Sequence, residues 1–108
     1  MEEKANFFDN EMLVRKLSYI LNGTNRIKIY LALIKGVKTA RELESDLNVV
    51  LTSVCRTLKG LEKRKVIKCI NSFESRGKLY KLEEDVLDLK LIIKDKAKKK
   101  DIKIPIFK

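Results

Sequence analysis

Residues 47–67 read LNVVLTSVCRTLKGLEKRKVI, and the apolar spacing in this stretch predicts a helix over residues 50–64. Apolar side chains recur every three or four residues and fall within roughly 80° of arc on a helical projection, which makes one face suitable for burial. This apolar stripe consists of Val50, Val54, Leu58 and Leu61. The opposite face carries Thr52, Arg56, Lys59 and Lys63. One helix is therefore expected to bury an apolar face and to present a cationic face to solvent.

The pattern changes from helical to alternating directly after this helix. Residues 66–71 (VIKCIN) and 78–82 (KLYKL) are typical of two strands, joined by the loop 72–77 (SFESRG). Gly77 suits the positive φ that such hairpin loops often need. The sequence therefore predicts a β-hairpin, with Tyr80 packed between the hairpin and the core.

Three helices are expected upstream of this region, over residues 6–22, 24–35 and about 39–47. Thr24 or Asn25 can cap the second helix, and Gly36 ends it. Thr39 and Glu42 have the spacing of a capping box at the start of the third. A last helix is expected over about 83–96, and the 98–108 tail is interpreted as an edge strand, a clamp on a partner or a frayed end.

The first and last helices each carry apolar side chains on two faces, which usually indicates two neighbours. One interpretation is that a single broad core buries both faces of these helices within one chain. We favour a symmetric dimer, because a single small domain offers little surface for a large partner. The residues expected in the dimer interface are Phe8, Met12, Tyr19, Leu87 and Leu91.

Length and composition narrow the class of protein. A chain of 108 residues makes one domain, and no apolar run approaches the roughly 20 residues that a membrane span needs. Its first residues, MEEK, have no secretory pattern, so a cytoplasmic location is expected. With no His and only two Cys, no catalytic constellation, metal site or cofactor is expected. The Lys-rich, Gln-free composition is typical of a thermophile.

The positive charge is concentrated rather than scattered. Of the net charge of +10, residues 49–81 contribute +7, from nine basic and two acidic side chains. Concentrated positive charge is typical of a protein that binds a polyanion such as nucleic acid.

The order of elements, and the stretches LNVVLTSVCRTLKGLEKRKVI (47–67) and RGKLYKL (76–82), resemble the winged helix-turn-helix of bacterial and archaeal transcription regulators. The closest likeness is to the arsenical-repressor-like and multiple-antibiotic-resistance-regulator-like groups. The resemblance implies a mainly α fold with a small β-hairpin, a winged helix-turn-helix with extra N- and C-terminal helices, from an archaeon or an archaeal virus. It divides the single domain, 1–108, into an N-terminal helix (1–23), a winged-helix core (24–82) and a C-terminal helix with a basic tail (83–108).

The resemblance also implies double-stranded DNA as partner and a nucleoid-associated homodimer that acts as a repressor. The helix at 50–64 would lie in the major groove, where Thr52, Ser53 and Arg56 are candidates to read bases. The remaining candidate contacts, to phosphates and at the wing, are Lys59, Lys63, Arg64, Lys65, Arg76 and Lys78. No residue points to a particular effector ligand. The alternatives are a sequence-indifferent architectural DNA-binding protein and a winged-helix module that binds an acidic protein.

Three residues or segments depart from the family pattern. Val50 stands where a Ser or Thr cap is usual, so Thr52 is an alternative cap for a shorter helix. Lys65 stands where Gly is usual, which predicts strain. Residues 42–47 (ELESDL) lack the paired cysteines of arsenical repressors, which excludes metal sensing by that route.

Two kinds of side chain keep more than one interpretation. Phe73, at the wing tip, packs across its own hairpin in the more frequent case and wedges into a minor groove in the rarer one. Cys55 and Cys69 are expected as small buried side chains, with a disulfide or a redox or metal switch as alternatives.

Overall fold

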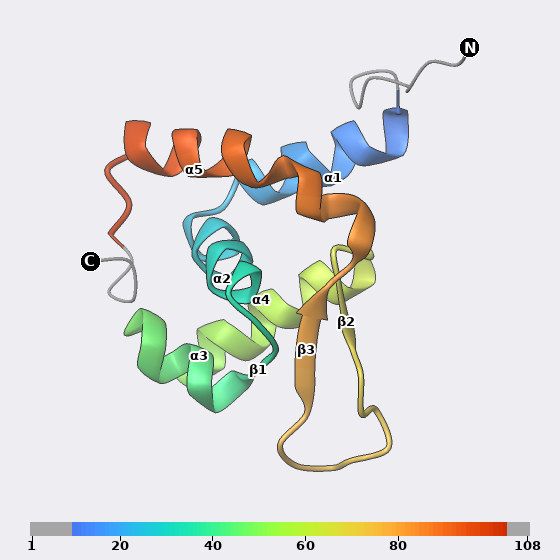
Figure 1. Cartoon of the computed structure of the whole chain (residues 1–108). Coiled ribbons are helices and arrows are strands. Elements are labelled where there is room, and N and C mark those ends of the chain that lie inside the picture. Colours follow the sequence, from blue (N-terminus) through green and yellow to red (C-terminus); the bar gives the residue numbers. More distant parts are fainter. Residues whose placement is uncertain (1–9, 104–108) are drawn as a thin grey trace.

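The computed structural model describes residues 10–103, in which five α-helices and a small three-stranded sheet pack into a mainly α fold (Figure 1). The helices are α1 (Glu11–Leu21), α2 (Thr24–Ile34), α3 (Ala40–Leu47), α4 (Leu51–Lys63) and α5 (Lys90–Lys99). The strands are β1 (Lys38–Thr39), β2 (Ile67–Cys69) and β3 (Leu79–Leu82), and a 3-10 helix, η2 (Glu84–Leu89), precedes α5. Phe8 and the end of the tail, including Ile104 and Ile106, lie outside the described residues.

Side-chain caps define the start of α1 and of α3, whereas the start of α2 has a different cap from the one expected. Asn10 caps α1, its side chain accepting from the Leu13 amide at 3.1 Å. At α3 the predicted capping box is confirmed, with Thr39 and Glu42 bonded reciprocally at 3.1 and 2.8 Å. The prediction for α2 was wrong, because Gly23 is its N-cap and neither Thr24 nor Asn25 supplies a capping bond.

One apolar core joins the helices to the sheet. α2 lies at its centre, since it contacts α1, α3, α4, α5 and β3 and buries six of its eleven residues. α1 contributes Leu13, Leu17 and Ile20, and α4 contributes Val54, Leu58 and Leu61, as the periodicity predicted. Val50, which we placed in the buried stripe, is instead exposed, because it lies outside the helix as its N-cap.

The sheet is antiparallel in the order β1-β3-β2, and β1 was not predicted. β2 pairs with β3 in the register Ile67↔Leu82, Lys68↔Lys81 and Cys69↔Tyr80, which confirms the hairpin. Strand β1 has only two residues, which pair with Tyr80 and Leu79. A pair of residues carries no alternation that could reveal a strand, so only the tertiary pairing defines it.

The segment predicted as one helix over 83–96 begins as the 3-10 helix and continues as α5. Val86, Leu89 and Ile93 are buried, as predicted, while Leu87 and Leu91 are exposed. Tyr30, fully buried in α2, donates a hydrogen bond to the carbonyl of Val86. At the end of the chain, Ile102 is half-buried against the core.

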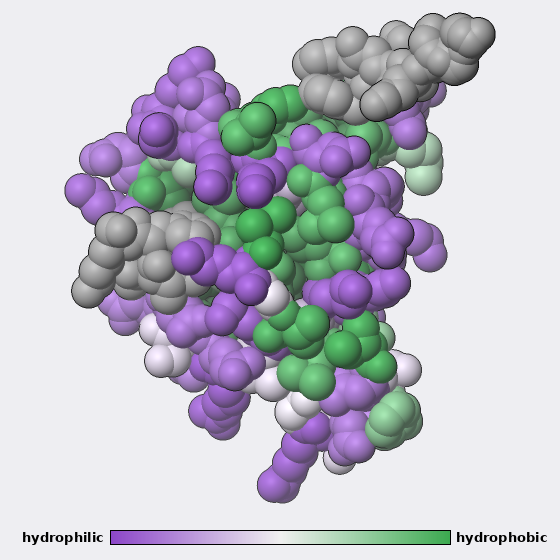
Figure 2. Space-filling view, viewed as in Figure 1, coloured by the Kyte–Doolittle hydropathy of each residue, from purple (hydrophilic) through white to green (hydrophobic). Residues whose placement is uncertain are grey.

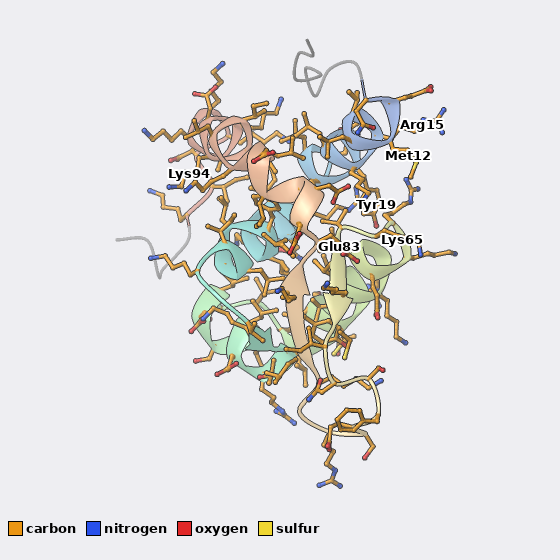
Figure 3. All side chains as sticks on the ribbon, turned by 45° about the vertical axis from the view of Figure 1, so that its right-hand side comes forward. Met12, Arg15, Tyr19, Lys65, Glu83 and Lys94 are labelled. Carbon is orange, nitrogen blue, oxygen red and sulfur yellow. The ribbon has the colours of Figure 1, made fainter. Side chains whose placement is uncertain are left out.

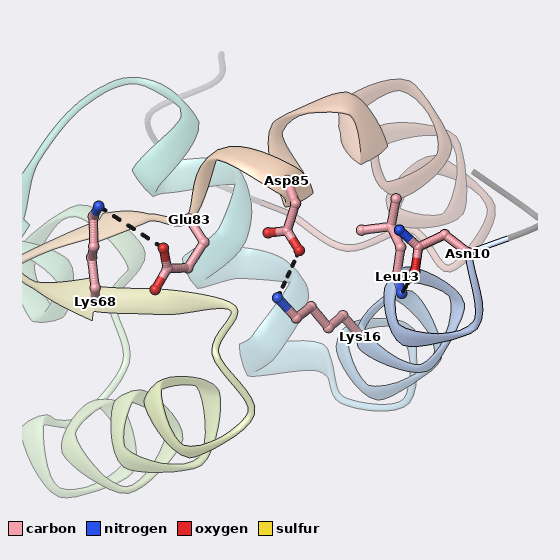
Figure 4. Close-up of polar contacts among 6 residues, drawn as sticks. All are labelled: Asn10, Leu13, Lys16, Lys68, Glu83 and Asp85. Carbon is pink, nitrogen blue, oxygen red and sulfur yellow. Dashed lines mark hydrogen bonds and ion pairs between the residues drawn. The ribbon is translucent and has the colours of Figure 1, made fainter. Parts of the chain in front are cut away.

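Two ion pairs fasten the 3-10 segment to its neighbours (Figure 4). Lys16 of α1 meets Asp85 at 2.7 Å, and Lys68 of β2 meets Glu83 at 3.9 Å. Because the Lys16 side chain is only 11% exposed, its pair with Asp85 is the better shielded of the two. These contacts tie α1 and the hairpin to the start of the C-terminal helical segment.

Candidate nucleic-acid interface

Helix α4 presents three cations and a threonine on its outer side. Opposite its buried stripe, Thr52, Arg56, Lys59 and Lys63 are all exposed. Ser53, the third candidate base reader, lies at the flank of this side and is half-buried. α4 begins at Leu51 and Val50 gives no side-chain cap, so Thr52 lies inside the first turn and is not the cap of a shorter helix.

The cations on this side have no acidic partner within the part of the chain that the structure describes. Arg56, Lys59 and Lys63 enter no ion pair there, whereas Lys16, Lys38 and Lys68 each have a carboxylate within 4 Å. Desolvating an unpaired surface cation against a polyanion does not require breaking an existing salt bridge. The outer side of α4 is therefore ready to bind an anion.

A shallow hollow of about 440 Å³ lies on the same side of α4. It is lined by Leu51, Thr52, Cys55, Arg56 and Lys59. Leu51 and Cys55 offer apolar surface among side chains that donate hydrogen bonds. Such a mixture can meet both the methyl group and the hydrogen-bonding edges that bases show in a major groove.

The turn that leads into α4 is short and fixed. α3 ends at Leu47, and Asn48 adopts the left-handed conformation with φ 56° and ψ 45°. Asn tolerates this region better than most residues, because its short polar side chain can bond locally. α3 and α4 pack against each other after this turn of three residues, 48–50.

The hairpin loop carries two further exposed candidate contacts, Arg76 and Lys78. Asn71 braces this loop: its side chain accepts from the Leu79 amide at 2.6 Å and donates to the Gly77 carbonyl at 3.2 Å. Gly77 has φ +66°, as the sequence predicted. The structure thus holds both ends of the loop together, and sequence reasoning missed the role of Asn71.

Arg64 and Lys65, both predicted phosphate contacts, lie away from the outer side of α4. The Arg64 guanidinium stacks over the Tyr19 ring at 4.4 Å, and Arg26 covers the same ring at 3.8 Å. Lys65 has φ 62°, which confirms the expected left-handed strain, and it borders a hollow of about 490 Å³ together with acidic side chains. The residues that line this hollow are Lys16, Lys65, Lys68, Glu83, Glu84 and Asp85. Figure 3 shows Tyr19, Lys65 and Glu83 on this side of the molecule.

The cysteines correct one expectation. Both are free, and Cys55 is exposed rather than buried, whereas Cys69 is half-buried with its thiol directed to the Asn71 side chain at 3.5 Å. Tyr80 lies near both thiols and Glu62. Burial, followed by the charges of Glu62, Cys69 and Cys55, raises the pKa of Tyr80. Tyr80 is partly buried against the core, as predicted.

The candidate dimer residues within the described part of the chain have two different environments. Met12, Leu87 and Leu91 are exposed, at 63%, 45% and 75%. Figure 2 shows apolar side chains gathered over α5 and η2 with hydrophilic ones around them. Tyr19 is instead covered within its own chain by Arg26 and Arg64, which removes it from this exposed set.

Comparison of the chain with models of known protein families and with curated proteins gave no match. Among residues 10–103, no group of three or more His, Cys, Asp or Glu side chains is placed to hold a metal ion. Within the same residues, no helix is both long and apolar enough to cross a membrane.

Proposed function

We propose that this protein is a homodimeric, sequence-specific double-stranded DNA-binding regulator of the winged helix-turn-helix class, which represses transcription by occluding its site. The observation that carries the proposal is the exposed, unpaired cationic outer side of α4, with Thr52, Arg56, Lys59 and Lys63 in line. An α-helix fits the major groove, and Arg56 has the planar fork that pairs bidentately with guanine O6 and N7.

The arrangement around α4 supports this role. α3, a three-residue turn and α4 form two packed helices in sequence, as in a helix-turn-helix. The hairpin β2–β3 follows directly, and its loop, which projects from the body (Figure 1), carries the exposed Arg76 and Lys78. Lys59 and Lys63, further along α4, meet phosphates, which position the protein without specifying sequence.

The exposed side of the C-terminal segment supports dimerisation. Residues Glu84 and Leu87 are three apart in the 3-10 helix, and Leu91 and Lys94 are three apart in α5, so these side chains follow one side of the segment. Among the described residues, neither Glu84 nor Lys94 takes part in an ion pair, and the segment is acidic at its start and basic at its end. Antiparallel pairing of two copies sets Leu87 against Leu91 and Glu84 against Lys94 across a twofold axis.

The experiment that tests the proposal measures binding of full-length protein to a labelled duplex recovered from a random pool, at several salt concentrations. Arg56→Ala is expected to lose about 1–3 kcal/mol on the preferred duplex and to relax base preference at one position. Arg15→Ala is the matched control, because Arg15 is an exposed arginine on α1. Equal losses on preferred and scrambled duplexes would make Arg56 a phosphate contact and favour an architectural protein, and no duplex binding at any salt would favour a protein partner.

A further inference from the structure

Phe73 is the most exposed of the large apolar side chains that the structure describes, at 84%. It does not pack across its own hairpin, which was the more frequent outcome expected for a residue at this position. The β2–β3 pairing ends at Cys69↔Tyr80, with one further backbone bond from Ile70 to Leu79 at 2.9 Å, so Phe73 lies beyond the last pair. Because aromatic side chains are enriched in interfaces relative to the rest of the protein surface, this exposed ring is a candidate contact for a partner.

Hydrogen bonds of Asn71 hold the loop that carries Phe73 in one conformation. Asn71 bonds to Gly77 and Leu79 on the far side of the loop, and its carbonyl accepts from the Glu74 amide at 2.9 Å. Phe73 lies within the turn that this last bond closes. A braced turn loses little conformational freedom when its tip enters a binding site.

The surroundings of Phe73 favour DNA as the partner. Arg76 and Lys78 follow it in the same loop, both exposed and both without an ion pair in the described part of the chain, and they outnumber the one acidic residue of the loop, the exposed Glu74. The loop projects from the body at the end of the hairpin, as Figure 1 shows. An apolar ring beside cations on a narrow projection matches the proteins that place apolar side chains between base steps from the minor groove, while cations hold the flanking phosphates.

We propose that Phe73 inserts between two base pairs from the minor groove next to the site read by α4, and kinks the duplex there. This inference rests on the proposed function. The wedge adds a second source of sequence preference, the deformability of a base step next to the site. Flexible pyrimidine–purine steps are therefore favoured at a position where the protein makes no hydrogen bond to a base.

The test uses the full chain and a 40-base-pair duplex recovered from a random pool, with 2-aminopurine placed in turn at each step flanking the site. Unstacking raises the fluorescence of 2-aminopurine, and end-to-end energy transfer reports bending. Wild type and Phe73→Leu are expected to raise the fluorescence at one flanking step and to bend the duplex. Phe73→Ala is expected to do neither and to bind about tenfold more weakly. Because the ring is exposed, neither substitution disturbs the core.

The outcomes separate the two proposals. Wild-type binding with no fluorescence change at any step, or with the same bend in Phe73→Ala, overturns the wedge and leaves DNA recognition by α4 intact. Equal loss in Phe73→Leu and Phe73→Ala also overturns it, because a wedge requires only apolar bulk. Failure of the wild-type protein to recover any duplex from the pool overturns both proposals and favours a protein partner for Phe73.

Discussion

The guanidinium of Arg64 stacks over the ring of Tyr19, with its central carbon 4.4 Å from the ring centre. Arg64 is the C-cap of α4, and Tyr19 belongs to α1, so this contact fixes one end of the proposed reading helix to the first helix. Arg26 completes the arrangement from α2, since it stacks on the same ring and donates to the Tyr19 carbonyl at 2.8 Å. α1, α2 and α4 are therefore held together by contacts around a single aromatic side chain, Tyr19.

Gly60 shows how closely Tyr19 approaches α4. A Cβ built at Gly60 would overlap the Tyr19 hydroxyl, although it would lie 3.6 Å from the ring carbon that bears it. Gly60→Ala is therefore expected to lower the free energy of unfolding by about 1 kcal/mol or more, despite the better helix propensity of Ala. In a Tyr19→Phe background, the same change should stabilise by up to about 1 kcal/mol. Urea unfolding of the four proteins checks this, and equal effects of Gly60→Ala in both backgrounds would contradict it.

Arg64 and Lys63 are neighbours with different expected roles. Arg64→Ala should lower stability by about 0.5–1 kcal/mol through loss of the contact with Tyr19, and leave the salt dependence of DNA binding unchanged. Lys63→Ala should leave stability unchanged and reduce the slope of log affinity against log salt by about one. Thermal unfolding and salt titrations of both variants separate the two roles. A reduced slope in Arg64→Ala would return Arg64 to the phosphate contacts.

Leu87 and Leu91 test the dimer. Leu87→Glu with Leu91→Glu should give a folded monomer with much weaker binding to its operator, because both side chains are exposed in the single chain and lie at the centre of the proposed interface. Light scattering measures the mass, and circular dichroism confirms the fold. A dimer mass in the double variant would refute this interface.

Ionisation of Tyr30 is expected to make the stability of the fold depend on pH above about 10. Burial, followed by the carboxylate of Asp88, raises the pKa of Tyr30 well above its usual value near 10. Above pH 10 the unfolded chain loses this proton while the folded chain keeps it, so stability is full below pH 10 and falls as pH rises, by up to about 1.4 kcal/mol per pH unit.

Tyr30→Phe supplies the control for this dependence. The variant should lose about 1–3 kcal/mol at neutral pH, because the Val86 carbonyl loses its donor. Between pH 10 and 11 its stability should fall less steeply than that of wild type. Parallel denaturation curves for the two proteins across this range would show that Tyr30 ionises equally in the folded and unfolded chain.

Features that depend on local spacing could be predicted from the sequence. The capping box at Thr39 and Glu42 and the buried stripe Val54, Leu58 and Leu61 need only a helix and the residues within it. The exposure of Leu87 and Leu91 follows in the same way, whereas the left-handed conformation of Lys65 was expected from the family resemblance, in which Gly is usual at that position. For the site, the exposed line of Thr52, Arg56, Lys59 and Lys63 was predicted from periodicity alone.

Features that depend on tertiary contact could not be predicted. Arg64 looked like one more cation of α4, because the ring that holds it comes from α1. β1 is defined only by its pairing with β3, and Asn71 only by partners across the loop. Gly60 gave a partial signal, since a glycine inside an otherwise regular helix indicates a close neighbour.

Enrichment of a random double-stranded DNA pool on the purified protein at near-physiological salt tests the central claim most directly. We expect recovery of an inverted repeat whose half-site centres lie about one helical turn apart, because a symmetric dimer places two copies of α4 in successive major grooves. Binding that fades with added salt and enriches no sequence would contradict sequence-specific recognition by α4.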